Sequence, residues 1–91
     1  MVNYKAGVRA ERRSQEVLEA AGYLTSRTAG SHGAFDVIGI SVTDIVLVQV
    51  KRGRNRPSEA DVRALRELVV PPNVRTMVHY WPIGAHEPVV M

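Results

Sequence analysis

Residues 35–51, with the sequence FDVIGISVTDIVLVQVK, decide how this chain folds. Two runs rich in β-branched residues, 35–40 and 45–51, are separated by the four residues Ser-Val-Thr-Asp. Strand-forming runs joined by a short polar loop are typical of a β-hairpin. The stretch therefore predicts two antiparallel strands connected by residues 41–44.

The length of that loop sets the register of the predicted hairpin. If the four residues form the loop, Ile40 pairs with Ile45, and counting outward places Asp36 opposite Gln49. Directly paired residues share a face, with Cβ atoms about 4.5–5.5 Å apart. Lys51 lies two residues beyond Gln49 and so projects from the same face. The register predicts three polar side chains at one end of an otherwise apolar hairpin.

The segment before the hairpin is predicted to form a helix and a short strand. Residues 7–21 carry small or apolar side chains with the i, i+4, i+7, i+8, i+11 spacing of one buried helical face. The members of this face are Ala10, Ser14, Val17, Leu18 and Ala21. Gly22 supplies the C-terminal stop, and residues 23–27 follow as the strand.

The segment after the hairpin is predicted to add a second helix and one or two strands. Ser58 and Asp61 resemble a capping box that opens this helix, and the prolines at 71 and 72 end it. Its expected buried residues are Val62, Leu65, Leu68 and Val69. Residues 74–81 alternate as a further strand, and residues 87–90 add a short edge. The order of elements predicts an α/β domain in which helices flank a central mixed sheet.

Composition is that of a small globular protein. The 91 residues have room for one domain, and so modest a core favours pairing with a second copy. The absence of cysteine excludes disulfides and cysteine-based zinc sites. No apolar run has membrane-spanning length, and the first residues lack the apolar segment of a secretory signal. We therefore expect no membrane association and a cytoplasmic location.

The net charge of +3 favours a polyanionic partner, and the basic residues are clustered. One cluster lies near the start of the chain and the other follows the hairpin. Their members are Lys5, Arg9, Arg12 and Arg13 in the first, and Lys51, Arg52, Arg54 and Arg56 in the second. The second cluster is interpreted as a loop that contacts a polyanion, with an ordinary solvated loop as the alternative.

Glu11 is the unexpected member of the first helix. It precedes Leu18 by seven residues and so lies only about 20° from it around the helix, on the apolar face. An unpaired buried carboxylate is costly, so a cation or several donors should lie nearby. A simple ion pair with an arginine such as Arg27 would satisfy this requirement, and so would a metal ion.

Taken together, these residues resemble a known family. The string comprises Gly7, Glu11-Arg12, Gly22-Tyr23, Arg27, Gly30-Ser31, Phe35-Asp36-Val37-Ile38 and Val48-Gln49-Val50-Lys51. It closely resembles the archaeal-type Holliday-junction resolvases, which belong to the restriction-endonuclease-like superfamily with the PD-(D/E)XK motif. The resemblance spans residues 4–52 and agrees in order, spacing and predicted secondary structure. It implies a single nuclease domain over residues 1–91.

Cleavage of a phosphodiester gives the polar residues roles. The reaction needs an aligned water and stabilisation of charge on the phosphate, and Mg²⁺ or Mn²⁺ can supply both. Asp36, the side-chain carbonyl of Gln49 and the main-chain oxygen of Val50 are expected metal ligands, with Glu11 bound directly or through water. Lys51 would orient the water or help to deprotonate it. The resemblance adds Ser31 near the metal or the scissile phosphate.

The resemblance also implies a DNA-binding surface and a symmetric dimer. The residues assigned to DNA binding are Lys5, Arg9, Arg12, Arg27, His32, Arg52, Arg54 and Arg56. Resolving a four-way junction takes two symmetric nicks, and a two-fold homodimer offers two sites. We therefore expect a homodimeric, Mg²⁺-dependent, structure-selective endonuclease that acts on four-way junctions.

Gln49 departs from the family pattern, which usually has glutamate at this position. Its carbonyl can still ligate a hard cation, but the site loses one negative charge. Three alternatives stay open. The chain is a nuclease of the same fold that acts on other branched, mismatched or duplex DNA, or a non-catalytic DNA-binding relative, or Gln49 and Lys51 are simply exposed at a strand end. Metal-dependent cleavage separates the enzymes from the non-catalytic relative.

Overall fold

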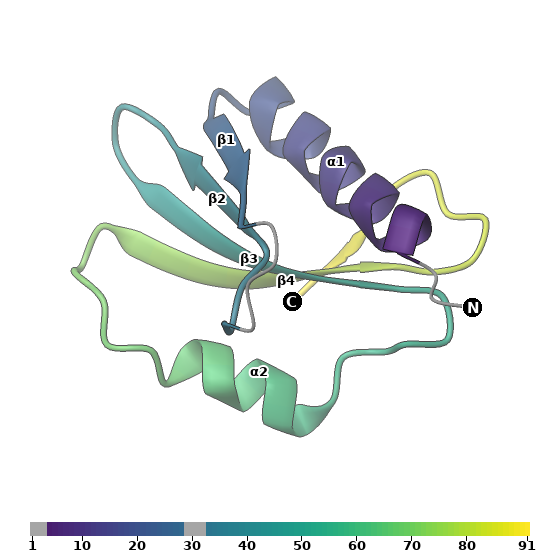
Figure 1. The fold of residues 1–91 in the computed structure, drawn as a ribbon. Coiled ribbons are helices and arrows are strands. Elements are labelled where there is room, and N and C mark those ends of the chain that lie inside the picture. The colour runs from purple at the N-terminus through teal and green to yellow at the C-terminus, as the bar shows by residue number, and fades with distance from the viewer. Residues whose placement is uncertain (1–3, 29–32) are drawn as a thin grey trace.

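The chain runs in the order helix, three strands, helix, two strands (Figure 1). The computed structural model describes residues 4–28 and 33–91, with the side chains of residues 4–6 left out. The helices are α1 (Tyr4–Ala20) and α2 (Glu59–Arg66); the strands are β1 (Leu24–Arg27), β2 (Val37–Ile40), β3 (Ile45–Arg52), β4 (Val74–Trp81) and β5 (Val89–Val90). The predicted α-β-β-β-α-β order is confirmed, and β5 is the expected short edge.

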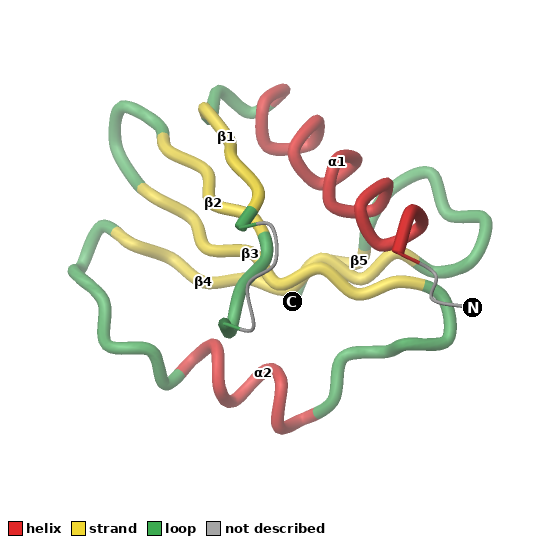
Figure 2. Tube along the Cα trace, in the orientation of Figure 1, coloured by secondary structure: helices red, strands yellow, loops and turns green. Residues whose placement is uncertain are grey.

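The strands form one mixed sheet in the order β1-β2-β3-β4-β5. Strands β1, β2 and β3 are antiparallel neighbours, β4 runs parallel to β3, and β5 is antiparallel to β4. Two parallel neighbours need a crossover connection, and α2 lies within it. Figures 1 and 2 show α1 across one side of the sheet and α2 along the other. The expectation of a central mixed sheet flanked by helices is confirmed.

The β2–β3 hairpin has the predicted register. Ile40 pairs with Ile45, and the ladder continues in step to Val37 and Val48. The loop is closed by a hydrogen bond from the Ser41 N–H to the Asp44 carbonyl at 2.8 Å. The four-residue loop was therefore read correctly from its polar composition.

Helix α1 packs on the sheet through a narrower face than the sequence predicted. Ala10, Ser14 and Leu18 are buried, whereas Val17 and Ala21 are exposed. The buried residues follow a single i, i+4, i+8 row; Val17 lies beside that row and away from the sheet, and Ala21 lies in the turn after the helix. The core partners of Leu18 on β2 and β3 are Val37, Val46 and Val48.

Helix α2 begins where predicted but ends early. Its capping box is present: the Ser58 side chain accepts from the Asp61 N–H, and the Asp61 side chain accepts from the Ser58 N–H. The helix ends at Arg66, so only Leu65 of the expected face is fully buried and Val69 is fully exposed. β-branched residues at 69 and 70 followed by proline disfavour helical backbone, which explains the early end.

Candidate active site

Asp36 lies where the chain enters β2, and a local distortion sets its position. Its N–H donates to the Val48 carbonyl at 2.8 Å, although Val48 is already the partner of Val37. Asp36 and Val37 thus both lie opposite Val48 in the ladder, which is a β-bulge. Bulges are common beside active sites. The predicted direct pairing of Asp36 with Gln49 is therefore wrong by one position. The Asp36 carboxylate instead accepts the Val50 N–H at 2.8 Å through Oδ2.

The bulge keeps the Asp36 carboxylate beside the Gln49–Val50 peptide group. Within residues 4–28 and 33–91, the Val50 N–H is its only hydrogen-bond donor. Its second oxygen, Oδ1, is therefore available to a ligand. Gln49 is half-buried, and its side chain forms no hydrogen bond to the described part of the chain.

Gln49 and Lys51 share a face of β3, as the strand alternation predicted. Val48 and Val50 pack toward α1, so the residues between and after them project toward α2. The Lys51 ammonium lies 3.6 Å from Oδ2 of Asp61 in the α2 capping box. Hydrogen bonds from the Ser58 backbone and side chain hold the pKa of Asp61 below its usual value, with a smaller contribution from Lys51. Asp61 thus stays ionised opposite Lys51.

Glu11 has the cationic partner that its buried position demanded. Its Oε1 accepts from Arg27 Nε at 2.9 Å, with the two side chains 23% and 19% exposed. This pair lies on the α1 side of the sheet, whereas Gln49 and Lys51 project from the other. Among the described residues, no three acidic, histidine or cysteine side chains gather as a metal-binding group. The predicted site residues therefore border the same end of the sheet without forming one cluster. These residues are Glu11, Asp36, Gln49 and Lys51.

The basic segment after β3 is anchored to the sheet at two points. The Tyr80 hydroxyl donates to the Gly53 carbonyl at 2.6 Å, and the Asn55 N–H donates to the Arg52 carbonyl at 3.0 Å. Gly53 has φ +59°, a left-handed conformation that glycine adopts without strain. The Arg56 guanidinium lies 5.8 Å from the centre of the Tyr80 ring. These contacts fix the backbone of the loop that carries the arginines.

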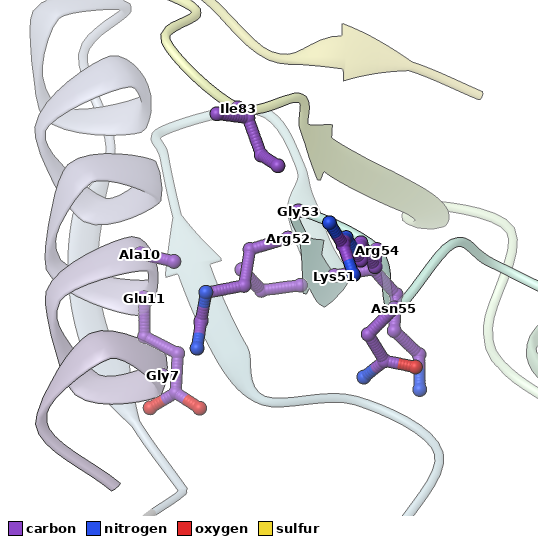
Figure 3. Close-up of a pocket in the computed structure, with 10 residues that line it drawn as sticks. Gly7, Ala10, Glu11, Lys51, Arg52, Gly53, Arg54, Asn55 and Ile83 are labelled. Carbon is purple, nitrogen blue, oxygen red and sulfur yellow. The ribbon is translucent and has the colours of Figure 1, made fainter. Parts of the chain in front are cut away.

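A cavity of about 540 Å³ lies between the start of α1 and this loop (Figure 3). Gly7, Ala10 and Glu11 line its helix side, and Arg52 and Asn55 line the opposite side. Figure 3 shows the Arg52 side chain extending across toward the Glu11 carboxylate. The cavity thus combines one paired carboxylate with several cations.

The remaining predicted site residues are peripheral or not described. Arg9 and Arg12 are exposed on α1, and Arg54 is exposed in the loop. Ser31 and His32 lie outside the described residues, and so does the side chain of Lys5. The geometry consequently supports an arginine-rich surface near the cavity and leaves Ser31 and His32 as predictions.

No protein-family model, curated protein or solved structure matches this chain. The function must therefore be argued from the site itself. None of the described helices is both long and apolar enough to cross a membrane.

The sequence did not predict a buried polar group that joins α1 to β4. Trp81 Nε1 donates to Ser14 Oγ at 2.9 Å, and His79 Nδ1 lies 2.9 Å from the same oxygen. Ser14 and His79 are at most 1% exposed, and burial lowers the pKa of His79. Because this group has no access to solvent, its role is to fix the helix on the sheet. A serine within the predicted buried helical face was the available signal.

Proposed function

We propose that this protein is a metal-dependent DNA endonuclease with a restriction-endonuclease-like fold, acting on branched DNA and, most specifically, on four-way junctions. One observation carries the proposal. A bulge holds the Asp36 carboxylate against the N–H of Val50, which stands between Gln49 and Lys51 in the chain, and Val50 and Lys51 also line the arginine-rich cavity. This is the Asp…Gln-x-Lys arrangement at the open end of a hairpin that the sequence resemblance implies.

The topology is compatible with the proposed fold. An antiparallel β1-β2-β3 unit is followed by a helix and a strand parallel to β3. The acidic residue stands at the start of β2, and the amide and the lysine stand in the second half of β3. The element order and the placement of these residues support the proposal together, since either feature alone is common.

The oxygen atoms near Asp36 suit a hard cation. The free carboxylate oxygen, the Gln49 side-chain carbonyl and the Val50 main-chain carbonyl are the candidate ligands for Mg²⁺ or Mn²⁺. Proteins usually hold Mg²⁺ through one or two carboxylates, with water and substrate phosphate completing the shell, so this set is sufficient. A bound ion would activate water and offset the charge on the phosphate. Glu11 is assigned to the outer ligand sphere, because Arg27 already neutralises it.

Lys51 is assigned to the phosphate and the attacking water. Its ammonium is 3.6 Å from Asp61, too long for a strong hydrogen bond, so its donors remain usable by a substrate. A compact cation at this position stabilises charge that develops on the phosphate in the transition state. Asp61 keeps the lysine side chain near the end of β3.

The arginines beside the site are proposed to bind the DNA backbone. Arg52 and Arg54 form no ion pair with any residue in the described ranges, so their charge is free for phosphates. Two copies of the chain would supply the two cuts that a four-way junction requires. We propose a homodimer on this ground.

A labelled four-way junction and a duplex of the same arm sequence test the proposal. We expect Mg²⁺-dependent nicking of the junction and tighter binding of the junction than of the duplex in EDTA. Cleavage of the duplex at the same rate would reassign the substrate to DNA in general. Binding without cleavage in Mg²⁺ or Mn²⁺ would favour the second candidate, a non-catalytic DNA-binding protein. Two observations favour this candidate: Gln49 carries no charge, and Glu11 is already paired with Arg27.

A further inference from the structure

The cavity in Figure 3 lies between the first turns of α1 and the loop after β3. Its volume of about 540 Å³ falls within the range of about 300–1,000 Å³ that small-molecule sites occupy. On α1, Gly7, Ala10 and Glu11 are spaced i, i+3 and i+4, so they face it together. A Cβ atom built on Gly7 would meet no described atom within 4 Å, so the described part of the chain leaves this side of the cavity open.

The walls of the cavity differ in chemistry. Ala10, Val50 and Ile83 supply apolar surface, and Ile83 is 80% exposed although it is a large hydrophobic residue. Asn55 offers an amide that can both donate and accept hydrogen bonds.

Charge in the cavity is unbalanced toward cations. Arg27 neutralises Glu11, and Asp61 faces Lys51. Arg52 and Arg54 have no such carboxylate within the described part of the chain. The cavity is therefore matched to a ligand that has an anionic group, an apolar part and a polar edge.

We infer that this cavity binds one unpaired nucleotide of a DNA strand. Arg52 and Arg54 would hold its phosphate, the apolar wall would contact the base, and Asn55 would reach the base edge. The inference rests on the proposed DNA-binding function and deepens it by naming what the site selects. A paired base must be unstacked before it can enter such a cavity, whereas an unpaired base has already lost that stacking. The protein therefore prefers DNA with unpaired nucleotides to continuous duplex.

Two duplexes that carry the fluorescent adenine analogue 2-aminopurine test this inference in EDTA, where no cleavage occurs. In one duplex the analogue is a single unpaired nucleotide, and in the other it is paired with thymine. We expect about tenfold tighter binding of the unpaired probe. We also expect its fluorescence to rise on binding, because no aromatic residue is among those that line the cavity, and a base held there is unstacked.

Gly7→Leu is the decisive variant, because the leucine side chain would occupy the cavity. Leucine is also a better helix former than glycine, so α1 should be retained, and circular dichroism checks this. Ala20→Leu, at the exposed end of the same helix, is the matched control. We expect Gly7→Leu to bind both probes equally, with unchanged affinity for the paired one, and Ala20→Leu to keep the tenfold preference. Asn55→Ala, in an exposed turn, provides a second variant if Gly7→Leu fails to fold.

The outcomes separate this inference from the proposed nuclease. Equal binding of the two probes by the parent protein, or an unchanged preference in both Gly7→Leu and Asn55→Ala, would overturn the nucleotide site and leave the nuclease standing. A preference that Gly7→Leu removes, in a protein that cuts no DNA in Mg²⁺, would establish the site and reject the nuclease. Failure to bind either probe would overturn the nucleotide site, and failure to bind the four-way junction as well would overturn both.

Discussion

Glu11 and Arg27, sixteen residues apart in the chain, form an ion pair of 2.9 Å that joins α1 to the end of β1. Both side chains are largely covered, so each charge depends on the other for compensation. A pair of this kind orients α1 on the sheet and also places the Glu11 carboxylate at the rim of the cavity. The structure thereby links the position of a proposed site residue to the stability of the domain.

The pair predicts an asymmetry between single and double variants. Arg27→Met leaves Glu11 partly buried without a cation and should lower the free energy of unfolding by about 1.5–3 kcal/mol, the scale of a charged hydrogen bond. Replacing both residues by methionine should cost less than Arg27→Met alone, because no charge is then left uncompensated. Urea unfolding of the three proteins measures this. A double variant that is less stable than Arg27→Met would contradict the interpretation.

Asp36 and Lys51 should be required for cutting more than for binding. Asp36→Asn keeps an oxygen that can accept the Val50 N–H but removes the charge, so the fold should be retained while Mg²⁺-dependent nicking is lost. Lys51→Ala should likewise abolish nicking, because the lysine serves the transition state more than the ground state. Junction binding in EDTA is the control and should change by less than about threefold, which corresponds to 0.65 kcal/mol. Near-normal cutting by either variant would remove that residue from the site.

Gln49→Glu should change how the proposed nicking activity responds to metal. The substitution keeps the side-chain length and one oxygen but adds a negative charge, and hard cations bind more tightly as ligand charge rises. Half-maximal nicking should therefore need less Mg²⁺, and Mg²⁺ should raise the melting temperature more than in the parent. Titrations of the two proteins side by side measure both effects. Coincident curves would place Gln49 outside the active site.

The loop arginines should govern how DNA binding responds to salt. Each phosphate contact that is lost should make the slope of log affinity against log salt shallower by about 0.9. Neutralising Arg52, Arg54 and Arg56 together should thus change the slope by up to about 2.7, with little dependence on base sequence. Neutralising Arg63, Arg66 and Arg75, which lie on α2 and β4, is the matched control. An unchanged slope in the first variant would show that the loop is a solvated turn that does not contact the DNA backbone.

His79 should make the protein less stable in weak acid. Burial lowers the pKa of His79 from its ordinary value of 6.5, so the unfolded chain binds its proton more readily than the folded one. The contribution of neutral His79 is complete above about pH 6.5 and is lost as the pH falls from there through the folded-state pKa. Asp44 and Asp61, whose pKa values are lowered from 3.8, lose their contributions only in stronger acid. Urea unfolding between pH 7.5 and 5.5 should therefore show a decline that His79→Asn reduces.

Local patterns predicted the parts of the fold that depend on neighbouring residues. The four residues of the hairpin loop, three of them polar, predicted the Ile40–Ile45 register, and Ser58 with Asp61 predicted the start of α2. Helix geometry placed Glu11 among apolar residues, and from there its need for a cation led to Arg27. Each of these inferences used residues whose relation is set by the geometry of a single element or turn.

What the sequence could not provide depends on contacts between distant segments. The bulge at Asp36 arises because the Val48 carbonyl accepts from two successive residues, and no residue type at 36 or 37 requires this. The Lys51–Asp61 contact depends on how α2 crosses the sheet. The same applies to the cavity, which exists only because the loop after β3 stands opposite the first turns of α1.

The hydrogen bonds of Ser14 to His79 and Trp81 span 65 and 67 positions of the chain. A ribosome releases α1 long before either partner has been made. Leu18 can contact the sheet once β3 has emerged, but the serine hydroxyl gains its partners only with β4. Helix α1 is thus synthesised well before it can be locked in place, and during translation its apolar face needs protection from aggregation until β4 appears.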